Sequence, residues 1–438
     1  MFDRFARGTG ANETVLALSV ARLGDAVGNS ILFVVLPLYV AQLPSPAFPL
    51  PDSVLVGLLI SLYGLANAVL QPLMGALSDR VGRRKPFILG GLVLMGASTL
   101  AFIVARRFAE LLIIRALQGV GVALTVPASL ALMTTATEKR TRGGSMGIYT
   151  TMRMVGFATG PLLGGFLYDR FGFNAAFFAG TGFILLGTIL VQMWVHEVLV
   201  HASQTNDRPF RIIDRDLLTP DIVGLGIATF VMASAFSMMT TLENEFNARL
   251  NATAFLFSVA FSALMVSRLI FQIPLGRLSD RVGRKPLIII GLILMAPVTA
   301  LLGLSTSIME LTGLRLGQGL ASAAVAAPAF ALAADLSSSG GEGRQMSIVT
   351  MGFGLGIALG PLAAGILATA FFELPFLVGA LVCLIGAWVV LRYVSESVKG
   401  EGDRGPASGR DVTSDDTDQV QRRPECPPAW KKRRDTGK

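Results

Sequence analysis

The sequence predicts an all-α integral membrane protein with twelve spanning helices in two related halves. Of its 438 residues, 52% are hydrophobic and 15% are charged, whereas a soluble domain has about 25% charged residues. The mean hydropathy is +0.62, and many apolar runs reach the roughly 20 residues that a helix needs to cross a bilayer. Three motifs also occur twice at nearly the same separation, which indicates a duplicated chain.

The repeated motifs define the two halves. GALSDRVGRRKP, which begins at residue 75, returns as GRLSDRVGRKP at residue 276. RALQG returns as RLGQG, and GFATGPLLGG returns as GIALGPLAAG. The separation is 200 or 201 residues in each case, far longer than the unit of a solenoid. The chain is therefore expected to hold two copies of one helical unit.

The first half is predicted to contain helices at 14–41, 54–77, 86–106, 108–135, 144–168 and 174–196. The first apolar run begins near Thr14 and lacks the short core and cleavage site of a signal peptide, so it is read as a first spanning helix. The second run leads into the repeated loop motif, and the third follows it. The fourth contains RALQG, the fifth contains GPLLGG, and the sixth ends at a polar stretch.

The second half is predicted to contain helices at 220–247, 252–276, 286–305, 308–334, 345–369 and 374–393, with the motifs in the same order. The N-terminal unit is thus 1–196, a cytoplasmic linker is 197–219, and the C-terminal unit is 220–393. Residues 394–438 are rich in Gly, Pro, Ser and Asp and end in KKRRDTGK, a composition expected to stay disordered. The basic end of this tail is either simply solvated or in contact with anionic lipid.

The basic residues of the short loops predict the orientation. Loops after even-numbered helices hold many more of them than loops after odd-numbered helices, and cytoplasmic loops are enriched in Lys and Arg. Both termini are therefore expected in the cytoplasm, with the protein in the plasma membrane. The even-loop set is Arg80, Arg83, Arg84, Lys85, Lys139, Arg140, Arg142, Arg208, Arg211, Arg215, Arg277, Arg281, Arg284, Lys285 and Arg344, and the odd-loop set is Arg106, Arg107, Arg170 and Arg249.

These motifs resemble those of the major facilitator superfamily of secondary transporters, over roughly residues 10–395. The loop signature between the second and third helices carries the resemblance, and the R-x-x-Q-G and G-P-x-x-G-G segments also fit. The last is the antiporter motif of the drug-efflux branches. The resemblance implies two six-helix bundles around a central cavity that opens alternately to each side. The parallel repeat agrees with that architecture.

The duplicated loop motif is predicted to act as a cytoplasmic gate. Asp79 and Asp280 lie at helix ends beside arginines, where a carboxylate accepts bonds from guanidinium groups and from a helix N-terminus. The alternative is that the arginines only set the membrane topology. The gating residues are Gly75, Asp79, Arg80, Gly82, Arg83, Gly276, Asp280, Arg281, Gly283 and Arg284.

Ionisable residues within spanning segments are costly, so they mark candidate functional positions. In the first helix, Arg22, Asp25 and Asn29 share one face because they are three and four residues apart. Asp25 is expected either to carry the coupling proton or to form a static ion pair with Arg22 or Arg115. The remaining candidates for the cavity or for proton coupling are Gln118, Arg153, Glu243, Arg268, Gln272 and Arg315, with Gln318 as the twin of Gln118.

Glycines recur every four residues in the fifth and eleventh helices, which predicts close packing of these helices against their neighbours. Pro161 and Pro361 remove a backbone donor and are expected to bend them. The positions are Gly156, Gly160, Pro161, Gly164, Gly165, Gly352, Gly356, Gly360 and Pro361. Tyr39, Tyr63, Tyr149, Phe157, Phe353 and Trp388 are candidates for lining a hydrophobic pocket.

Two transport functions remain open from sequence. The first is proton-driven efflux of hydrophobic or amphipathic compounds, favoured by the helix-5 motif and the acid at position 25. The second is symport or exchange of an anionic or sugar-like metabolite. It is favoured by the excess of arginines deep in the spanning helices, although these could also pair with Glu243 and Glu245. A receptor on the same fold is a third class, but the compact loops offer no sensing domain.

Other functions are disfavoured. His196 and His201 form no catalytic constellation, and no G-x-x-x-x-G-K-S/T loop for ATP is present. Cys383 and Cys426 suggest neither a disulfide framework nor a metal site. We therefore expect no enzyme activity, no cofactor besides the proton motive force, and no nucleic-acid partner despite the net charge of +8. The expected partners are a small-molecule substrate, protons and the lipid bilayer, with the protein as a monomer.

Overall fold

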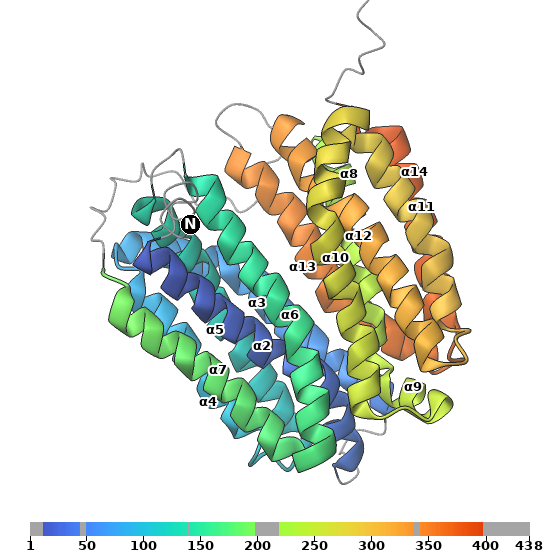
Figure 1. Cartoon of the computed structure of the whole chain (residues 1–438), viewed down its shortest axis with the longest axis horizontal. Helices are drawn as coiled ribbons and strands as arrows, with labels where there is room; N and C mark the ends of the chain where they lie inside the picture. Colours follow the sequence, from blue (N-terminus) through green and yellow to red (C-terminus); the bar gives the residue numbers. More distant parts are fainter. Residues whose placement is uncertain (1–11, 44–49, 138–140, 198–218, 337–341, 397–438) are drawn as a thin grey trace, which may run out of the picture. The chain divides into compact units, whose positions relative to one another are not determined.

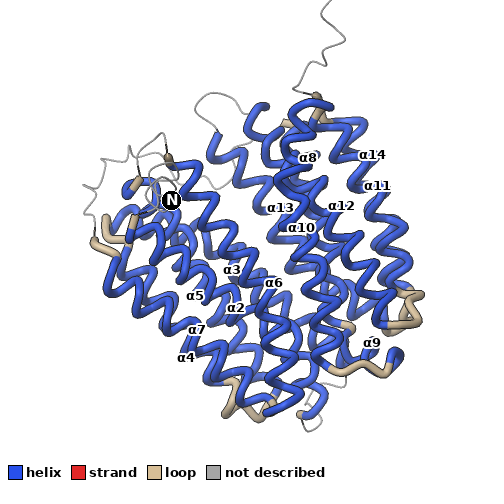
Figure 2. Tube along the Cα trace, in the orientation of Figure 1, coloured by secondary structure: helices blue, strands red, loops and turns tan. Residues whose placement is uncertain are grey.

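The structure, a computed structural model, describes residues 12–43, 50–137, 141–197, 219–336 and 342–396, and these residues contain helices and no strand (Figure 2). The first half contains α2 (Glu13–Gln42), α3 (Asp52–Val81), α4 (Lys85–Ala101), α5 (Phe108–Ala136), α6 (Arg142–Phe171) and α7 (Phe173–Trp194). The second contains α8 (Pro220–Ser237), η2 (Met238–Thr241), α9 (Glu243–Leu250), α10 (Ala254–Val282), α11 (Arg284–Leu302), α12 (Ile308–Leu336), α13 (Glu342–Ala368) and α14 (Leu374–Tyr393).

The predicted all-helical membrane fold is confirmed. Within the described ranges, ten helices are long and apolar enough to span a membrane. Of the other two predicted spans, α4 is apolar but has only 17 residues, and α6 has 30 residues but is more polar. Several helices begin at side chains that cap their free amides, among them α12, where Ser307 accepts from the amide of Glu310 at 3.2 Å. Asn12 accepts from the amide of Val15 at 2.8 Å, and Thr219 and Thr253 cap α8 and α10 in the same way.

The seventh predicted helix, 220–247, is broken, which corrects its sequence assignment. It divides into α8, the short 3₁₀ turn η2, and α9. Hydroxyl side chains compete with helical hydrogen bonding at this point: Thr240 Oγ1 donates to the carbonyl of Ser237 at 2.6 Å, and Thr241 Oγ1 donates to the carbonyl of Pro361 at 3.0 Å. Glu243 therefore lies on a separate short helix.

The helices form two bundles, α2–α7 and α8–α14 (Figure 1). In the first, α2 packs on α6 and α7, and α5 packs on α3 and α4; in the second, α8 packs on α13 and α14, and α12 packs on α10 and α11. The glycines of α6 and α13 allow these close approaches. A Cβ atom at Gly156 would lie 2.6 Å from Cβ of Ala26, and one at Gly356 would lie 2.4 Å from the carbonyl oxygen of Phe230.

The two bundles pack against each other through two helix pairs, α3 with α13 and α6 with α10. The close contacts lie where α3 begins and α13 ends: a Cβ atom at Gly57 would lie 2.9 Å from the carbonyl of Pro361, and Ser61 Oγ donates to the carbonyl of Ala358. In the other pair, Asp169 at the end of α6 accepts from the amide of Phe255 at 3.0 Å. One end of the interface is therefore closed.

The predicted unit boundaries need one adjustment at the tail. Residues 394–396 were assigned to the tail, but they pack on the second bundle: Val394 is buried, and the amide of Ser395 donates to Asp221 at 2.6 Å. The described residues up to 396 belong to one compact unit. The rest of the tail from residue 397, and the linker from 198 to 218, lie outside the described residues, so their predicted character stays a prediction.

Candidate functional site

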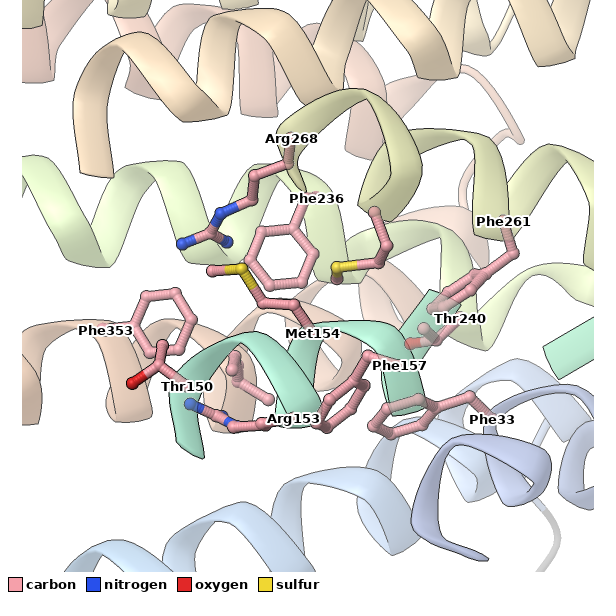
Figure 3. A pocket seen from close by; sticks show the side chains of 12 residues that line it. Phe33, Thr150, Arg153, Met154, Phe157, Phe236, Thr240, Phe261, Arg268 and Phe353 are labelled. Carbon is pink, nitrogen blue, oxygen red and sulfur yellow. The ribbon is translucent and has the colours of Figure 1, made fainter. Parts of the chain in front are cut away.

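A pocket lies between the two bundles and is lined by both of them (Figure 3). Helix periodicity explains the lining. The α6 residues at 150, 153, 154 and 157 and the α10 residues at 261, 265 and 268 each occupy one helical face. Residues of α2, α8, η2 and α13 complete the wall. The full lining is Phe33, Thr150, Arg153, Met154, Phe157, Phe236, Thr240, Phe261, Met265, Arg268, Phe353 and Ile357.

The pocket wall is mainly aromatic. Phe33 packs against Phe157 and Phe261, each at a ring-centroid separation of 6.0 Å, and Phe236 lies 6.1 Å from Phe353. The contact between Phe33 and Phe261 joins a ring of the first bundle to a ring of the second. Together with two methionines, the rings offer a polarisable surface for apolar or aromatic ligands.

Two arginines supply the charge in this wall. The Arg153 guanidinium lies 5.4 Å from the ring centroid of Phe157, and that of Arg268 lies 5.6 Å from the centroid of Phe353, which are cation–π distances. Neither arginine forms an ion pair within the described part of the chain. The Nε atoms of both are buried, and no described residue accepts a hydrogen bond from them.

Asp25 lies outside the pocket wall and is paired within its own helix. Arg22 Nη1 donates to Asp25 Oδ2, and both side chains are buried. Of the two partners considered from sequence, the structure therefore shows Arg22 and not Arg115. Asp25 Oδ1 is buried with no hydrogen-bond donor among the described residues, and the charge of Arg153 acts on this carboxylate.

Arg115 and Gln118 form a network of hydrogen bonds within the first bundle. Arg115 Nη1 donates to Gln118 Oε1 at 3.1 Å and more weakly to Asn29 Oδ1 at 3.5 Å. Gln118 Nε2 donates to Thr99 Oγ1 at 3.0 Å, and Asn29 donates to the hydroxyl of Tyr63. The network fixes α5 against α2 and α4.

The twin motif makes a matching network in the second half. Arg315 Nη1 donates to Gln318 Oε1 at 2.6 Å, and Gln318 Nε2 donates to Thr299 Oγ1 at 3.2 Å. Instead of a side chain on the first helix of its half, Arg315 binds the backbone carbonyl of Phe236 at 3.1 Å. Its guanidinium also lies 5.3 Å from the Phe261 ring centroid. This network therefore supports two rings of the pocket.

Other predicted site residues lie elsewhere. Gln272 follows Arg268 by one turn but does not line the pocket. Glu243 is fully buried on α9, where burial raises the pKa of its carboxyl group well above 4.5, while Asn247 opposes the shift and Asp169 adds to it. Burial likewise raises the pKa of Glu245. Neither glutamate pairs with an arginine among the described residues; Arg249 instead pairs with Glu373 at 2.7 Å.

Some of the predicted aromatic residues line the pocket and others do not. Phe157 and Phe353 line the pocket, whereas Tyr39 donates to the carbonyl of Ala105 at 2.7 Å, and Trp388 is exposed on the outer surface of α14. Phe33, Phe236 and Phe261 were not predicted. The chain has 27 phenylalanines, and sequence alone does not distinguish a ring facing lipid from a ring facing the cavity.

The duplicated loop motif lies at the helix ends remote from the closed interface. Gly82 and Gly283 have φ of 66° and 109°, in the region that favours glycine. Arg284 bonds Asp280 at 3.3 Å and also pairs with Asp335. The side chain of Asp79 is outside the described set, and Arg80, Arg83 and Arg281 are exposed. Gly75 and Gly276 face α5 and α12 of their own halves, so the structure presents no contact between the halves at these glycines.

Sequence reasoning missed two acids that cap the helices after these loops. Glu197 accepts from the amides of Arg84 and Lys85 at 2.9 and 3.1 Å. Glu396 accepts from the amides of Arg284 and Lys285 at 3.2 and 2.8 Å. The two glutamates are 199 residues apart, close to the repeat separation, which is the signal that would have found them.

Comparison with known proteins places these features in a family. The sequence model of the Major Facilitator Superfamily matches residues 18–247 and 222–435. The chain belongs to the major facilitator superfamily. Its duplicated motifs and its pocket between two bundles are consistent with that membership.

Two relatives with similar identity to this chain have names that state different substrates. The chain is 28% identical over 390 residues to a multidrug resistance protein MdtG of Salmonella dublin, covering 87% of this chain and 95% of that protein. It is also 28% identical over 331 residues to the synaptic vesicular amine transporter of Bos taurus, covering 73% of this chain and 62% of that protein.

Solved structures share the fold at low identity. A bacterial homologue of the human lysosomal transporter Spinster, in an inward-facing and occupied conformation, matches with a TM-score of 0.72 at 16% identity, covering 86% of this chain and 95% of that one. The human organic anion transporter MFSD10 matches with a TM-score of 0.62 at 20% identity, covering 86% and 99%. The chain is therefore a multi-pass membrane transporter of the superfamily.

Proposed function

We propose that this transporter moves small amphipathic compounds with an apolar or aromatic body, by alternating access coupled to protons. The observation that carries the proposal is the pocket between the bundles, which is predominantly apolar and aromatic with a few polar groups. Such a lining is typical of small-molecule sites. The kinship with a multidrug resistance protein supports the same substrate class and favours export.

The packing between the bundles supports alternating access. The close contacts of α3 with α13 and of α6 with α10 lie at one end, and the small residues Gly57, Gly64 and Gly165 make those contacts tight. If the basic loops are cytoplasmic, as we propose together with cytoplasmic termini and a plasma-membrane location, the closed end is the outer one. This arrangement corresponds to an inward-facing state of a monomeric transporter.

Asp25 is our proposed coupling acid. It is a carboxylate buried on a helix that packs against the pocket-lining α6, and one of its oxygens has no donor among the described residues. A carboxylate whose exposure to water changes between two conformations changes its proton affinity between them. That change is the requirement for coupling transport to the proton motive force, and we propose no other cofactor.

The test is uphill transport by the purified protein in proteoliposomes. With an imposed pH gradient, we expect accumulation of amphipathic aromatic dyes against their concentration gradient, and a protonophore should abolish it. Equal uptake with and without the gradient would refute proton coupling. A second candidate, exchange of an anionic metabolite, is favoured by Arg153 and Arg268; accumulation of a hydrophilic organic anion but of no dye would select it.

A further inference from the structure

The two pocket arginines come from opposite halves of the protein. Arg153 lies on α6 and Arg268 on α10, and Figure 3 shows both guanidinium groups directed toward the part of the pocket that holds Thr150 and Phe353. The rings of Phe33 and Phe261 lie toward the other end. The positive charge of the pocket is therefore concentrated toward one end, while aromatic rings line both ends.

Neither of these arginines belongs to the duplicated scaffold. The residue that corresponds to Arg153 in the second half is Phe353, 200 positions later, and the residue that corresponds to Arg268 in the first half is Asn67, 201 positions earlier. Arg115 and Arg315, by contrast, are twins with twin hydrogen bonds. The duplication therefore accounts for the presence of Arg115 and Arg315, but it does not account for the two arginines of the pocket.

The pocket charge has no counter-charge in its own wall. Thr, Phe, Met and Ile make up the rest of the lining, with no acid. The acid whose charge acts on Arg153 is Asp25, and Asp25 Oδ2 already accepts from Arg22. Two guanidinium groups that share a partly buried site cost free energy unless an anion pairs with them. They also repel each other across the boundary between the halves.

We propose that Arg153 and Arg268 bind the anionic head of the transported compound, an organic anion with a carboxylate, sulfonate or phosphate on an apolar body. This inference rests on the proposed function. Guanidinium forks match the geometry of these oxyanions, and the body extends over the phenylalanines. An anion between the two arginines also removes their repulsion, so binding favours the approach of the two halves, whereas a cation does not.

The test measures the binding of three probes that share one ring system to the full-length protein in lipid nanodiscs. They are 2-naphthalenesulfonate, 2-naphthalenemethanol and 2-naphthylmethylammonium. We expect the sulfonate to bind at least about tenfold more tightly than the ammonium. Arg153→Gln and Arg268→Gln should each weaken sulfonate binding by roughly tenfold to a hundredfold, the range for a charge-assisted hydrogen bond, and leave the alcohol nearly unchanged.

Arg170→Gln is the matched control, because Arg170 lies on the same helix as Arg153 but is exposed at its end. It should leave all three affinities unchanged. The inference is overturned if the parent binds the ammonium as tightly as the sulfonate, and the proposed function then still stands. Binding of none of the three, with no dye transport, would overturn both.

The ranking of the probes and one further measurement keep the result decisive. If a glutamine variant fails to fold, the ranking of the probes on the parent protein decides the question alone. The anionic head could belong to a lipid or to a water-soluble compound, and competition by lysophosphatidic acid separates the two. If lysophosphatidic acid displaces labelled sulfonate at a lower concentration than unlabelled sulfonate does, a single-chain lipid is the better ligand. If it needs a higher concentration, a water-soluble aromatic anion is the better ligand.

Discussion

At the scale of single residues, Asp25 forms a buried ion pair with Arg22, nearly one turn earlier on α2. The spacing of three residues predicted that Arg22 and Asp25 share a face, and they form an ion pair. From sequence, Arg115 was the other possible ion-pair partner of Asp25, because the packing of α5 against α2 decides which arginine lies closer. The structure places Asn29 and Gln118 beside Arg115 instead.

Asp25→Asn is expected to abolish uphill transport driven by a pH gradient and to spare downhill exchange. Asparagine keeps the shape and polarity of the side chain but carries no titratable proton. Proton release on substrate binding to the purified protein is the direct measurement. Release equal to that of the parent would show that another group, with Glu243 as the next candidate, carries the proton.

The buried carboxyl group of Glu243 should make the stability of the folded protein depend on pH. Its pKa in the folded state is raised by burial, so the folded protein holds this proton at pH values where the unfolded chain releases it. Stability should therefore fall as pH rises above about 4.5, the usual pKa of glutamate, until the folded-state pKa is reached. Glu243→Gln should flatten this decline in thermal unfolding curves recorded across that range.

Glu373 serves as a control, because its pKa is shifted in the direction opposite to that of Glu243. Its hydrogen bond with Arg249 lowers its pKa, so its contribution to stability is present above the usual pKa of glutamate and is lost as pH falls through the folded-state value. Glu373→Gln should therefore alter only the acidic limb of the curve. A parent curve that is flat above pH about 4.5 would contradict the prediction for Glu243.

At the scale of elements, helix positions could be read from apolar runs, but the break in the seventh helix could not. The run from 220 to 241 is long and apolar enough to span a membrane, and its hydroxyl residues do not by themselves show that the helix breaks at Ser237. Besides the local bond of Thr240 to Ser237, the break depends on a tertiary contact, because Thr241 bonds the carbonyl of Pro361 on another helix. The acids that cap α4 and α11 were missed because polar flanks resemble ordinary loops until their partners are known.

These capping acids should stabilise the fold unequally. A carboxylate that accepts two amides at a helix N-terminus contributes about 1–2 kcal/mol when partly buried and less when exposed. Glu197 is partly buried and Glu396 is exposed. Glu197→Ala should therefore lower the free energy of unfolding more than Glu396→Ala, with Glu197→Gln between the parent and Glu197→Ala. Equal losses in thermal unfolding of the two alanine variants would contradict this reading.

At the scale of the whole molecule, the duplication visible in the sequence accounts for the fold, while the pocket depends on departures from it. Repeated bonds join Gln118 to Thr99 and Gln318 to Thr299, both 19 residues apart. The wall positions 153 and 353, and likewise 157 and 357, are repeat partners, but their residue types differ, so the sequence repeat does not reveal which side chains line the pocket. The predicted gate role of the loop motif stays a prediction, because alternation requires comparison of two states.

Alternation requires that the closed end of the interface open, and Ser61 and Ala358 test this directly. Ser61 on α3 bonds the backbone of Ala358 on α13, and a Cβ at Gly64 would lie 2.9 Å from Cβ of Ala358. Cysteines at 61 and 358, in a Cys383→Ala, Cys426→Ala background, should therefore form a disulfide on oxidation. A protease site inserted between 198 and 218 reports the bond, because the cleaved halves then stay linked.

Transport by the oxidised double-cysteine protein should fall nearly to zero, because a bond between α3 and α13 holds the two bundles together at that end. Probe binding should persist, since no residue of the pocket wall is altered. Each single-cysteine variant should transport normally after the same oxidation, and reduction of the disulfide should restore the double variant. If the cross-linked protein transported at the rate of the reduced protein, the bundles would not need to separate there, and alternating access through this interface would be wrong.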